Sequence, residues 1–188
     1  MIDWRAAMPI EIVLPITEPE TEWVRGRALQ KMSPARDHAR LQAALIVALA
    51  PWAARRGEVG PEWRFRVEPP GEARRPLVPD VAFVSFERLE GLTLDEIQAP
   101  SLAPTVAIEI LSPGDRAADV MAKVDVYLRA GTSLVVIIDG PHRTLRLYDA
   151  ARGVVELHGD AVFAHEALPG FALPLPELFG ALEWPPRR

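Results

Sequence analysis

Two acidic residues lie inside otherwise apolar segments of this chain, and one lysine follows them. Glu109 lies within residues 105–111, and Asp80 lies within residues 77–85, directly after a proline. A buried carboxylate loses its hydration, so it needs a cation or hydrogen-bond donors nearby. Two carboxylates that converge favour a hard divalent ion such as Mg²⁺, which also binds water and phosphate oxygens. We therefore expect a metal site where the two acids meet, with Lys123 as the nearest cationic side chain.

The segments around Glu109 and Lys123 predict a strand, a helix and a second strand. Residues 105–111 are short, rich in β-branched side chains and apolar on both faces, as in a central strand covered by helices on both sides. Residues 116–130 show helical spacing, with Ser112 or Asp115 as the expected N-cap. Residues 134–139 predict the next strand, so the helix would form a right-handed crossover between two neighbouring strands.

Each of these charged residues also has an ordinary structural interpretation. Lys123 borders the apolar stripe of its helix and could pair on the surface with Asp119, one turn earlier. Asp80 follows a proline and could simply start or cap its strand at a turn. The metal-site hypothesis instead requires Asp80 and Lys123 to lie close to Glu109.

The order of these residues resembles that of the Uma-two family of restriction endonucleases, which is assigned to the PD-(D/E)XK nuclease superfamily. The resemblance spans about residues 20–150. One departure from the superfamily pattern concerns the lysine expected two positions after the strand acid, because this position is Leu111. In the Uma-two pattern the lysine has moved to the following helix, where this chain has Lys123. The matching stretches are Glu22 to Arg27, Met32-Ser33-Pro34 with His38, Pro79-Asp80, Glu109 within Ile-Glu-Ile-Leu-Ser-Pro, Lys123 within a helix ending Tyr-Leu-Arg-Ala-Gly, and residues 135–141.

The resemblance implies metal-dependent hydrolysis of phosphodiester bonds in DNA. Asp80 and Glu109 would hold Mg²⁺ or Mn²⁺, and the backbone carbonyl of Ile110 or Leu111 would complete the ligand set. Lys123 would orient the attacking water or stabilise the transition state. A different metal-dependent hydrolase acting on small phosphoesters uses the same ligand types, so ligand chemistry alone leaves that alternative open.

Two further residues are candidates for the same site. Glu22 resembles the additional acidic residue that the superfamily carries near its N-terminal element. His38 falls on the inner side of a helix expected over residues 33–56, with Ser33 as its cap and Pro34 in its first turn. A lone histidine in such a position is more often a hydrogen-bonded core residue than a catalyst, but the resemblance makes it a neighbour of the site.

Length and composition limit the class of protein. A chain of 188 residues, 49% of them hydrophobic, can bury one sizeable core, so we expect a single domain. No apolar run approaches the ~18 residues of a membrane-spanning helix. The absence of cysteine excludes disulfides and thiolate metal sites and agrees with a cytoplasmic location. Residues 1–20 predict an extended arm in which residues 10–14 form an edge strand or an oligomer contact, and residues 183–188 predict a frayed tail.

Charge is distributed unevenly along the chain. The net charge is −5, but residues 22–75 hold 11 basic against 6 acidic residues. These residues either form a basic rim for nucleic-acid phosphates or are ordinary solvated arginines. We expect DNA as the partner and no membrane, and a homodimer would suit cleavage of both strands. The acidic balance keeps a second hypothesis open, a catalytically silent dimeric binding or scaffold module on a nuclease-type fold.

The remaining pattern completes an α/β fold, a restriction-endonuclease-like mixed sheet flanked by helices with an added C-terminal β-hairpin. The sheet centre is expected from the strands at residues 62–85, 105–111 and 134–157. Other expected elements are a hairpin at 22–30, a strand at 62–67 paired with 77–85, an irregular or helical excursion at 88–98, a hairpin at 144–150 and 154–159, and a short helix at 177–182.

Overall fold

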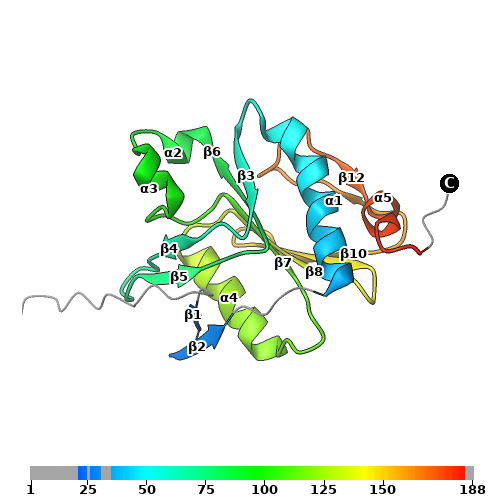
Figure 1. The fold of residues 1–188 in the computed structure, drawn as a ribbon, viewed down its shortest axis with the longest axis horizontal. Helices are drawn as coiled ribbons and strands as arrows, with labels where there is room; N and C mark the ends of the chain where they lie inside the picture. Colours follow the sequence, from blue (N-terminus) through cyan, green and yellow to red (C-terminus); the bar gives the residue numbers. More distant parts are fainter. Residues whose placement is uncertain (1–20, 25, 31–34, 185–188) are drawn as a thin grey trace, which may run out of the picture.

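A six-stranded mixed sheet runs through the centre of the computed structural model, which describes residues 21–24, 26–30 and 35–184 (Figure 1). Helix α4 (Ala117–Arg129) connects the two parallel strands, β7 and β8, and every other neighbouring pair in this sheet is antiparallel. The predicted mixed α/β sheet is therefore confirmed. Its strands, in spatial order, are β10 (Gly153–Leu157), β9 (Thr144–Asp149), β8 (Leu134–Asp139), β7 (Val106–Ile110), β6 (Val81–Ser85) and β3 (Gly57–Pro61).

Strand β7 is buried along its whole length, as its apolar composition on both faces predicts. Val106, Ile108 and Ile110 pack into the cluster beneath α1. Ala107 belongs to the cluster on the α4 side, against which Leu111 also packs. Because side chains alternate along a strand, Glu109 shares the α4 face with these two residues.

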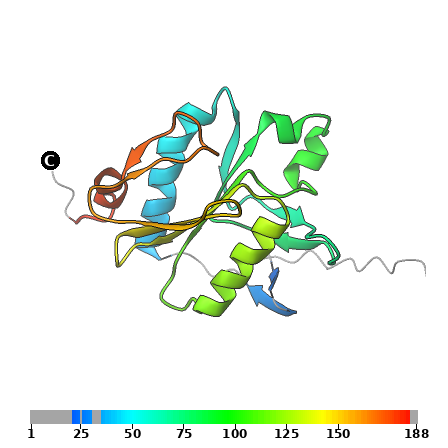
Figure 2. The same ribbon diagram turned by 180° about the vertical axis from the view of Figure 1, so that it is seen from behind.

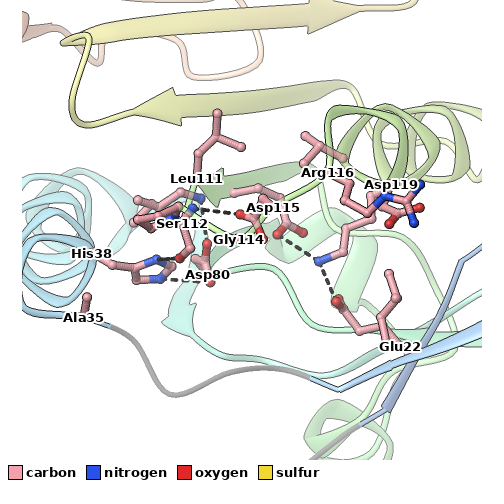
Figure 3. Close-up of a pocket in the computed structure, with 16 residues that line it drawn as sticks. Glu22, Ala35, His38, Asp80, Leu111, Ser112, Gly114, Asp115, Arg116 and Asp119 are labelled. Carbon is pink, nitrogen blue, oxygen red and sulfur yellow. Dashed lines mark hydrogen bonds and ion pairs between the residues drawn. The ribbon is translucent and has the colours of Figure 1, made fainter.

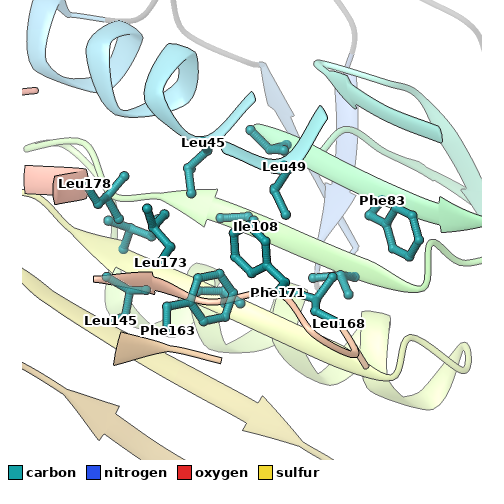
Figure 4. Close-up of a cluster of buried hydrophobic side chains, with 14 of the residues drawn as sticks. Leu45, Leu49, Phe83, Ile108, Leu145, Phe163, Leu168, Phe171, Leu173 and Leu178 are labelled. Atoms are coloured by element: carbon teal, nitrogen blue, oxygen red, sulfur yellow. The ribbon is translucent and has the colours of Figure 1, made fainter. Parts of the chain in front are cut away.

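One face of the sheet is covered by α1 (Arg36–Ala53) and by the C-terminal segment (Figures 1 and 2). The buried stripe of α1 consists of Leu41, Leu45, Leu49 and Ala53, spaced by four residues so that all four meet the sheet. Figure 4 shows Leu45 and Leu49 pointing toward the sheet. Full burial of each leucine contributes about 1.5–3 kcal/mol. The C-terminal segment supplies β11 (Val162–Phe163), β12 (Leu173–Pro174) and α5 (Leu175–Gly180).

The opposite face is covered by α4 and by two small hairpins. Val24, Phe65 and Val67 come from the hairpins and are fully buried, as is Tyr127 of α4. The first hairpin turns at Gly26, whose φ of 70° suits glycine, and confirms the prediction for residues 22–30. The hairpin strands are β1 (Thr21–Val24) with β2 (Arg27–Gln30), and β4 (Phe65–Val67) with β5 (Arg75–Leu77).

The end of α1 differs from the sequence-based expectation. The helix ends at Ala53 instead of residue 56, and Gly57 starts β3, a strand that the sequence did not predict. A Cβ added at Gly57 would lie 2.0 Å from the carbonyl oxygen of Val84 in the neighbouring strand β6. Gly57 is therefore needed for the close approach of two backbones, and it does not cap the helix.

The expected strand at residues 77–85 is also corrected. Leu77 ends β5, which pairs with β4, whereas β6 begins at Val81 and joins the central sheet. Pro79 lacks a backbone N–H and so cannot donate to a ladder, which favours a break at this position. Asp80 consequently lies immediately before a central strand and not within it.

The remaining elements are short. The excursion expected at 88–98 forms two helices, α2 (Phe86–Leu89) and α3 (Leu94–Gln98). No helix in the described part of the chain is long and apolar enough to cross a membrane. The predictions for residues 1–20, for Ser33 and Pro34, and for the tail beyond residue 184 lie outside the described residues.

Candidate active site

A pocket of about 580 Å³ opens where β7 ends and α4 begins (Figure 3). It lies on the α4 side of the sheet and reaches the first turn of α1. Every residue predicted from the sequence to form a site contributes to its wall, together with the loop that follows β7. The lining residues are Glu22, Leu29, Ala35, His38, Asp80, Glu109, Ile110, Leu111, Ser112, Pro113, Gly114, Asp115, Arg116, Asp119, Val120 and Lys123.

Glu109 is the buried carboxylate at the end of β7. Its side chain meets two donors from α4, because Lys123 and Tyr127 are one helical turn apart. Lys123 Nζ lies 3.2 Å from Glu109 Oε2, and the Tyr127 hydroxyl donates to Glu109 Oε1 over 3.1 Å. Each carboxylate oxygen therefore has a partner supplied by the crossover helix.

Lys123 also binds Glu22, which comes from strand β1. The Nζ–Oε2 distance to Glu22 is 2.5 Å, so one ammonium bridges two buried carboxylates. Burial alone would lower the pKa of Lys123, but the charges of Glu109 and Glu22 outweigh it and raise the pKa above its ordinary value. The surface pair with Asp119 does not form, because Asp119 instead accepts a hydrogen bond from Arg27 at 2.6 Å.

Tyr127 also contacts the site through its hydroxyl group, although its spacing in the sequence indicates only a packing residue on the apolar face of α4. Burial raises the pKa of Tyr127 well above its ordinary value, and the charges of Glu109 and Glu22 raise it further. The hydroxyl therefore stays protonated and donates to Glu109. The sequence holds no separate signal for this role, because an aromatic residue in a buried stripe is usually only a packing residue.

Asp80 reaches from the start of β6 to the end of β7. Its Oδ2 accepts a hydrogen bond from the backbone N–H of Ile110 at 2.6 Å, next to Glu109. Its Oδ1 lies 3.2 Å from Nε2 of His38. Asp80 does precede a strand, as its ordinary interpretation expected, but its carboxylate points across to β7 and to α1.

His38 is held between Asp80 and the loop after β7. Its Nδ1 lies 3.3 Å from Ser112 Oγ. The expected N-cap arrangement of this loop is wrong, since the N-cap of α4 is Arg116, with no side-chain hydrogen bond. Asp115 instead accepts a hydrogen bond from the backbone N–H of Ser112 at 2.7 Å, which fixes the loop beside the histidine.

Glu62, which does not line the pocket and which the sequence did not indicate, lies beside two of its lining residues, His38 and Asp80. Ligand atoms from His38, Glu62 and Asp80 lie within 4.8 Å of one another, as a set of metal ligands would. Carboxylate oxygens with an imidazole nitrogen suit a divalent ion such as Mn²⁺, and carboxylates alone suit Mg²⁺. The pocket thus has the donor chemistry of a metal site.

A mixed sheet whose central strand ends in a buried glutamate, with an aspartate beside it and a lysine on the crossover helix, defines a restriction-endonuclease-like protein. The chain matches the Uma2 family, described as "Putative restriction endonuclease", over residues 12–176, and it belongs to that family. It is also similar to the crystal structure of "a putative nuclease belonging to DUF820" from Anabaena variabilis. The two share 25% sequence identity with a TM-score of 0.76, over 90% of this chain and 95% of that one.

A comparison with curated proteins found no match. The family and the fold together make this a nuclease-like protein, in agreement with the resemblance seen in the sequence. The Lys123 ammonium lies 3.2 Å from the strand acid Glu109, which accords with the departure at Leu111.

Proposed function

We propose that this protein is a metal-dependent endonuclease that hydrolyses phosphodiester bonds in DNA. The observation that carries this proposal is the meeting of Asp80, Glu109 and Lys123 in one pocket at the end of β7. The family description, which names restriction endonucleases, and the nuclease named in the similar crystal structure both support this class of reaction.

The donors of the pocket fit Mg²⁺ or Mn²⁺. Asp80 and Glu109 are hard oxygen donors with only 3% and 8% of their surface exposed, and the carbonyl of Ile110 is the third proposed ligand. When bound, the ion would lower the pKa of a water molecule and offset negative charge on the scissile phosphate. The backbone N–H of Ile110 orients Asp80 for this task through its hydrogen bond.

Lys123 would supply a fixed positive charge to the reaction. Its raised pKa keeps the amine protonated, so it cannot act as a general base. A compact ammonium near the scissile phosphate stabilises the negative charge that develops in the transition state. Glu22 acts as a positioning residue, since it holds the amine at 2.5 Å from a second element, and His38 positions Asp80.

Exposed arginines around the pocket support a nucleic-acid substrate. Arg116 lines the pocket itself, and Arg36 lies in the first turn of α1, whose neighbours Ala35 and His38 also line it. Such cations contact phosphates and supply most of the non-specific affinity for DNA. DNA is the substrate that the family description favours.

Cleavage of supercoiled plasmid and of single-stranded DNA tests the proposal. We expect cleavage with Mg²⁺ or Mn²⁺ and none with EDTA, and strong losses in Asp80→Asn, Glu109→Gln and Lys123→Met. Glu156→Gln is the matched control, because Glu156 on β10 forms an exposed ion pair with Arg146 on β9, outside the pocket. Equal residual nicking in all these proteins would mean a contaminant and would overturn the proposal.

A catalytically silent binding or scaffold module is the second candidate. It is favoured by one observation, that Lys123 and Tyr127 already satisfy both oxygens of Glu109. Calorimetric titration with Mn²⁺ separates the two functions, since an enzyme should show heat that depends on Asp80 and Glu109 and a scaffold should show none. Light scattering after size-exclusion chromatography tests the homodimer that cutting both strands would suit.

A further inference from the structure

At the α1 end of the pocket, Glu62 lies beside the lining residues His38 and Asp80 and forms with them a second set of ligand types. We propose that His38 and Glu62 join Asp80 as ligands of one divalent cation, in a mixed nitrogen and oxygen site. Within the ranges that the structure describes, this is the one group of three or more histidine, aspartate or glutamate residues whose ligand atoms lie within 4.8 Å of one another. The inference rests on the proposed function in one respect, that the chain takes a divalent ion at Asp80.

The geometry of His38 suits a metal ligand. Adjacent ligands of an octahedral ion lie about 3.0 Å apart when each is about 2.1 Å from the ion. His38 Nε2 and Asp80 Oδ1 are 3.2 Å apart, so this pair needs little movement to share an ion. The other ring nitrogen, Nδ1, lies 3.3 Å from Ser112 Oγ, and a partner of this kind usually fixes the tautomer and orientation of a metal-bound histidine.

The backbone conformation of Glu62 and its hydrogen bonds hold it beside Asp80. Its φ of 51° lies in the left-handed region, which is strained for a residue with a Cβ. The backbone N–H of Glu62 donates to the carbonyl of Asp80 at 3.2 Å, and Gln42 Nε2 donates to Glu62 Oε1 at 2.9 Å. Gln42 also donates to the Asp80 carbonyl at 2.8 Å and lies one turn after His38, so α1 fixes all three ligands.

Glu109, the second carboxylate ligand of the proposed nuclease site, already has two partners on α4. Glu109 already meets Lys123 and Tyr127, so an ion shared with Asp80 must compete with the ammonium for Glu109 Oε2. An ion between His38, Glu62 and Asp80 leaves Lys123 in place. An imidazole ligand favours Mn²⁺ and other first-row transition ions over Mg²⁺, which prefers oxygen. The site therefore favours Mn²⁺.

Pulsed electron paramagnetic resonance of bound Mn²⁺ tests the ligand set in the full chain. We expect a ¹⁴N coupling from imidazole in the wild type and its loss in His38→Gln. Calorimetry should show Mn²⁺ affinity reduced by about tenfold or more in both His38→Gln and Glu62→Gln. Mg²⁺ affinity should fall less in His38→Gln. The control is His142→Gln, which removes an exposed histidine 2.9 Å from Asp139 and should retain the coupling.

Two outcomes overturn the inference and are distinguishable. If Mn²⁺ binds without ¹⁴N coupling and only Asp80→Asn and Glu109→Gln weaken it, this ligand set is wrong and the proposed nuclease function stands. If Mn²⁺ does not bind the wild type at all, both fail. Should His38→Gln unfold, as judged by circular dichroism, the wild-type coupling and the exposed Glu62→Gln variant still decide the question.

Discussion

Lys123 Nζ lies 3.2 Å from Glu109 Oε2, although the two residues belong to different layers of the fold. Strand β7 supplies the carboxylate and the crossover helix α4 supplies the ammonium, 14 residues later. The chain thus provides beside Glu109 the kind of positive charge that a bound divalent ion would provide. Stability and the proposed catalysis consequently depend on the same pair of residues.

Replacing Lys123 should therefore destabilise the protein strongly. Lys123→Met keeps a similar side-chain volume but leaves Glu22 and Glu109 buried without their cation. Removing one partner of a buried pair costs about 3–5 kcal/mol, because the remaining charge is uncompensated. Urea unfolding followed by circular dichroism measures this loss in the free energy of unfolding.

Two comparison variants show whether this loss of stability comes from the buried bridge of Lys123. Arg146→Met breaks the exposed pair with Glu156 and should cost less than about 1 kcal/mol. Glu22→Gln in the Lys123→Met background should recover part of the stability, because one of the two stranded carboxylates becomes neutral. A Lys123→Met protein as stable as Arg146→Met would show that the buried bridge is absent in solution.

The raised pKa values of Lys123 and Tyr127 predict how stability depends on pH. The contribution of Lys123 is fully present below its unfolded pKa of 10.5 and is lost as pH rises through its higher folded pKa. Tyr127 ionises above pH 10.0 only in the unfolded chain, which also favours unfolding there. The free energy of unfolding should therefore fall above about pH 10, by about 1.4 kcal/mol per pH unit for each such group.

Comparison of the wild type with Tyr127→Phe checks this dependence. The variant loses a donor to the buried Glu109 and should be about 1–3 kcal/mol less stable near pH 7. It should also show a shallower decline above pH 10, because one group that ionises only on unfolding is missing. Identical slopes in the two proteins would mean that the Tyr127 hydroxyl is accessible to hydroxide in the folded state.

Much of the central unit could be predicted from the sequence because its signals are local. The β7–α4–β8 segment has apolar runs, a helical stripe and clear breaks, so each element follows from its own residues. Strand β3 could not be predicted, since the role of Gly57 depends on Val84 in a neighbouring strand. The two-residue strands β11 and β12 are too short to show any periodicity.

The residues of the pocket region also differ in whether their own segment of sequence indicates their role. Asp80, Glu109 and Lys123 could be grouped because a charge inside an apolar segment demands a partner. Glu62 gave no such signal, since it was expected to be the first residue of an ordinary strand. Its place beside Asp80 arises from the turn after β3 and from Gln42 on α1, which no local pattern reveals.

The close approach of β3 to β6 makes Gly57 sensitive to substitution. Gly57→Ala would place its Cβ 2.0 Å from the Val84 carbonyl oxygen, so the backbone must shift. Overpacking of this kind typically costs about 1–3 kcal/mol, measured as a lower thermal midpoint. Gly180→Ala is the matched control, because a Cβ at Gly180 meets nothing within 4 Å at the end of α5. Equal midpoints for Gly57→Ala and the wild type would contradict the β3–β6 pairing.

The final prediction concerns the position of the amine and rests on the proposed nuclease function. Lys123→Met should reduce DNA cleavage by about 10²–10³-fold, because a charge that stabilises the transition state is lost. Leu111 also lines the pocket and lies two residues after Glu109, on the same face of the chain. An amine introduced there can approach the same carboxylate from β7 instead of α4.

Leu111→Lys should therefore restore part of the cleavage lost in Lys123→Met, by about tenfold or more. The matched control is Leu111→Met with Lys123→Met, which has a similar side-chain length but no ammonium and should stay inactive. Initial rates of plasmid nicking at saturating Mn²⁺ measure the rescue, and unfolding curves identify variants that fail to fold. If the folded Leu111→Lys variant shows no more activity than the Leu111→Met control, the position of the amine on α4 is itself required. The charge must then reach the substrate from the helix, and its presence beside Glu109 is not sufficient.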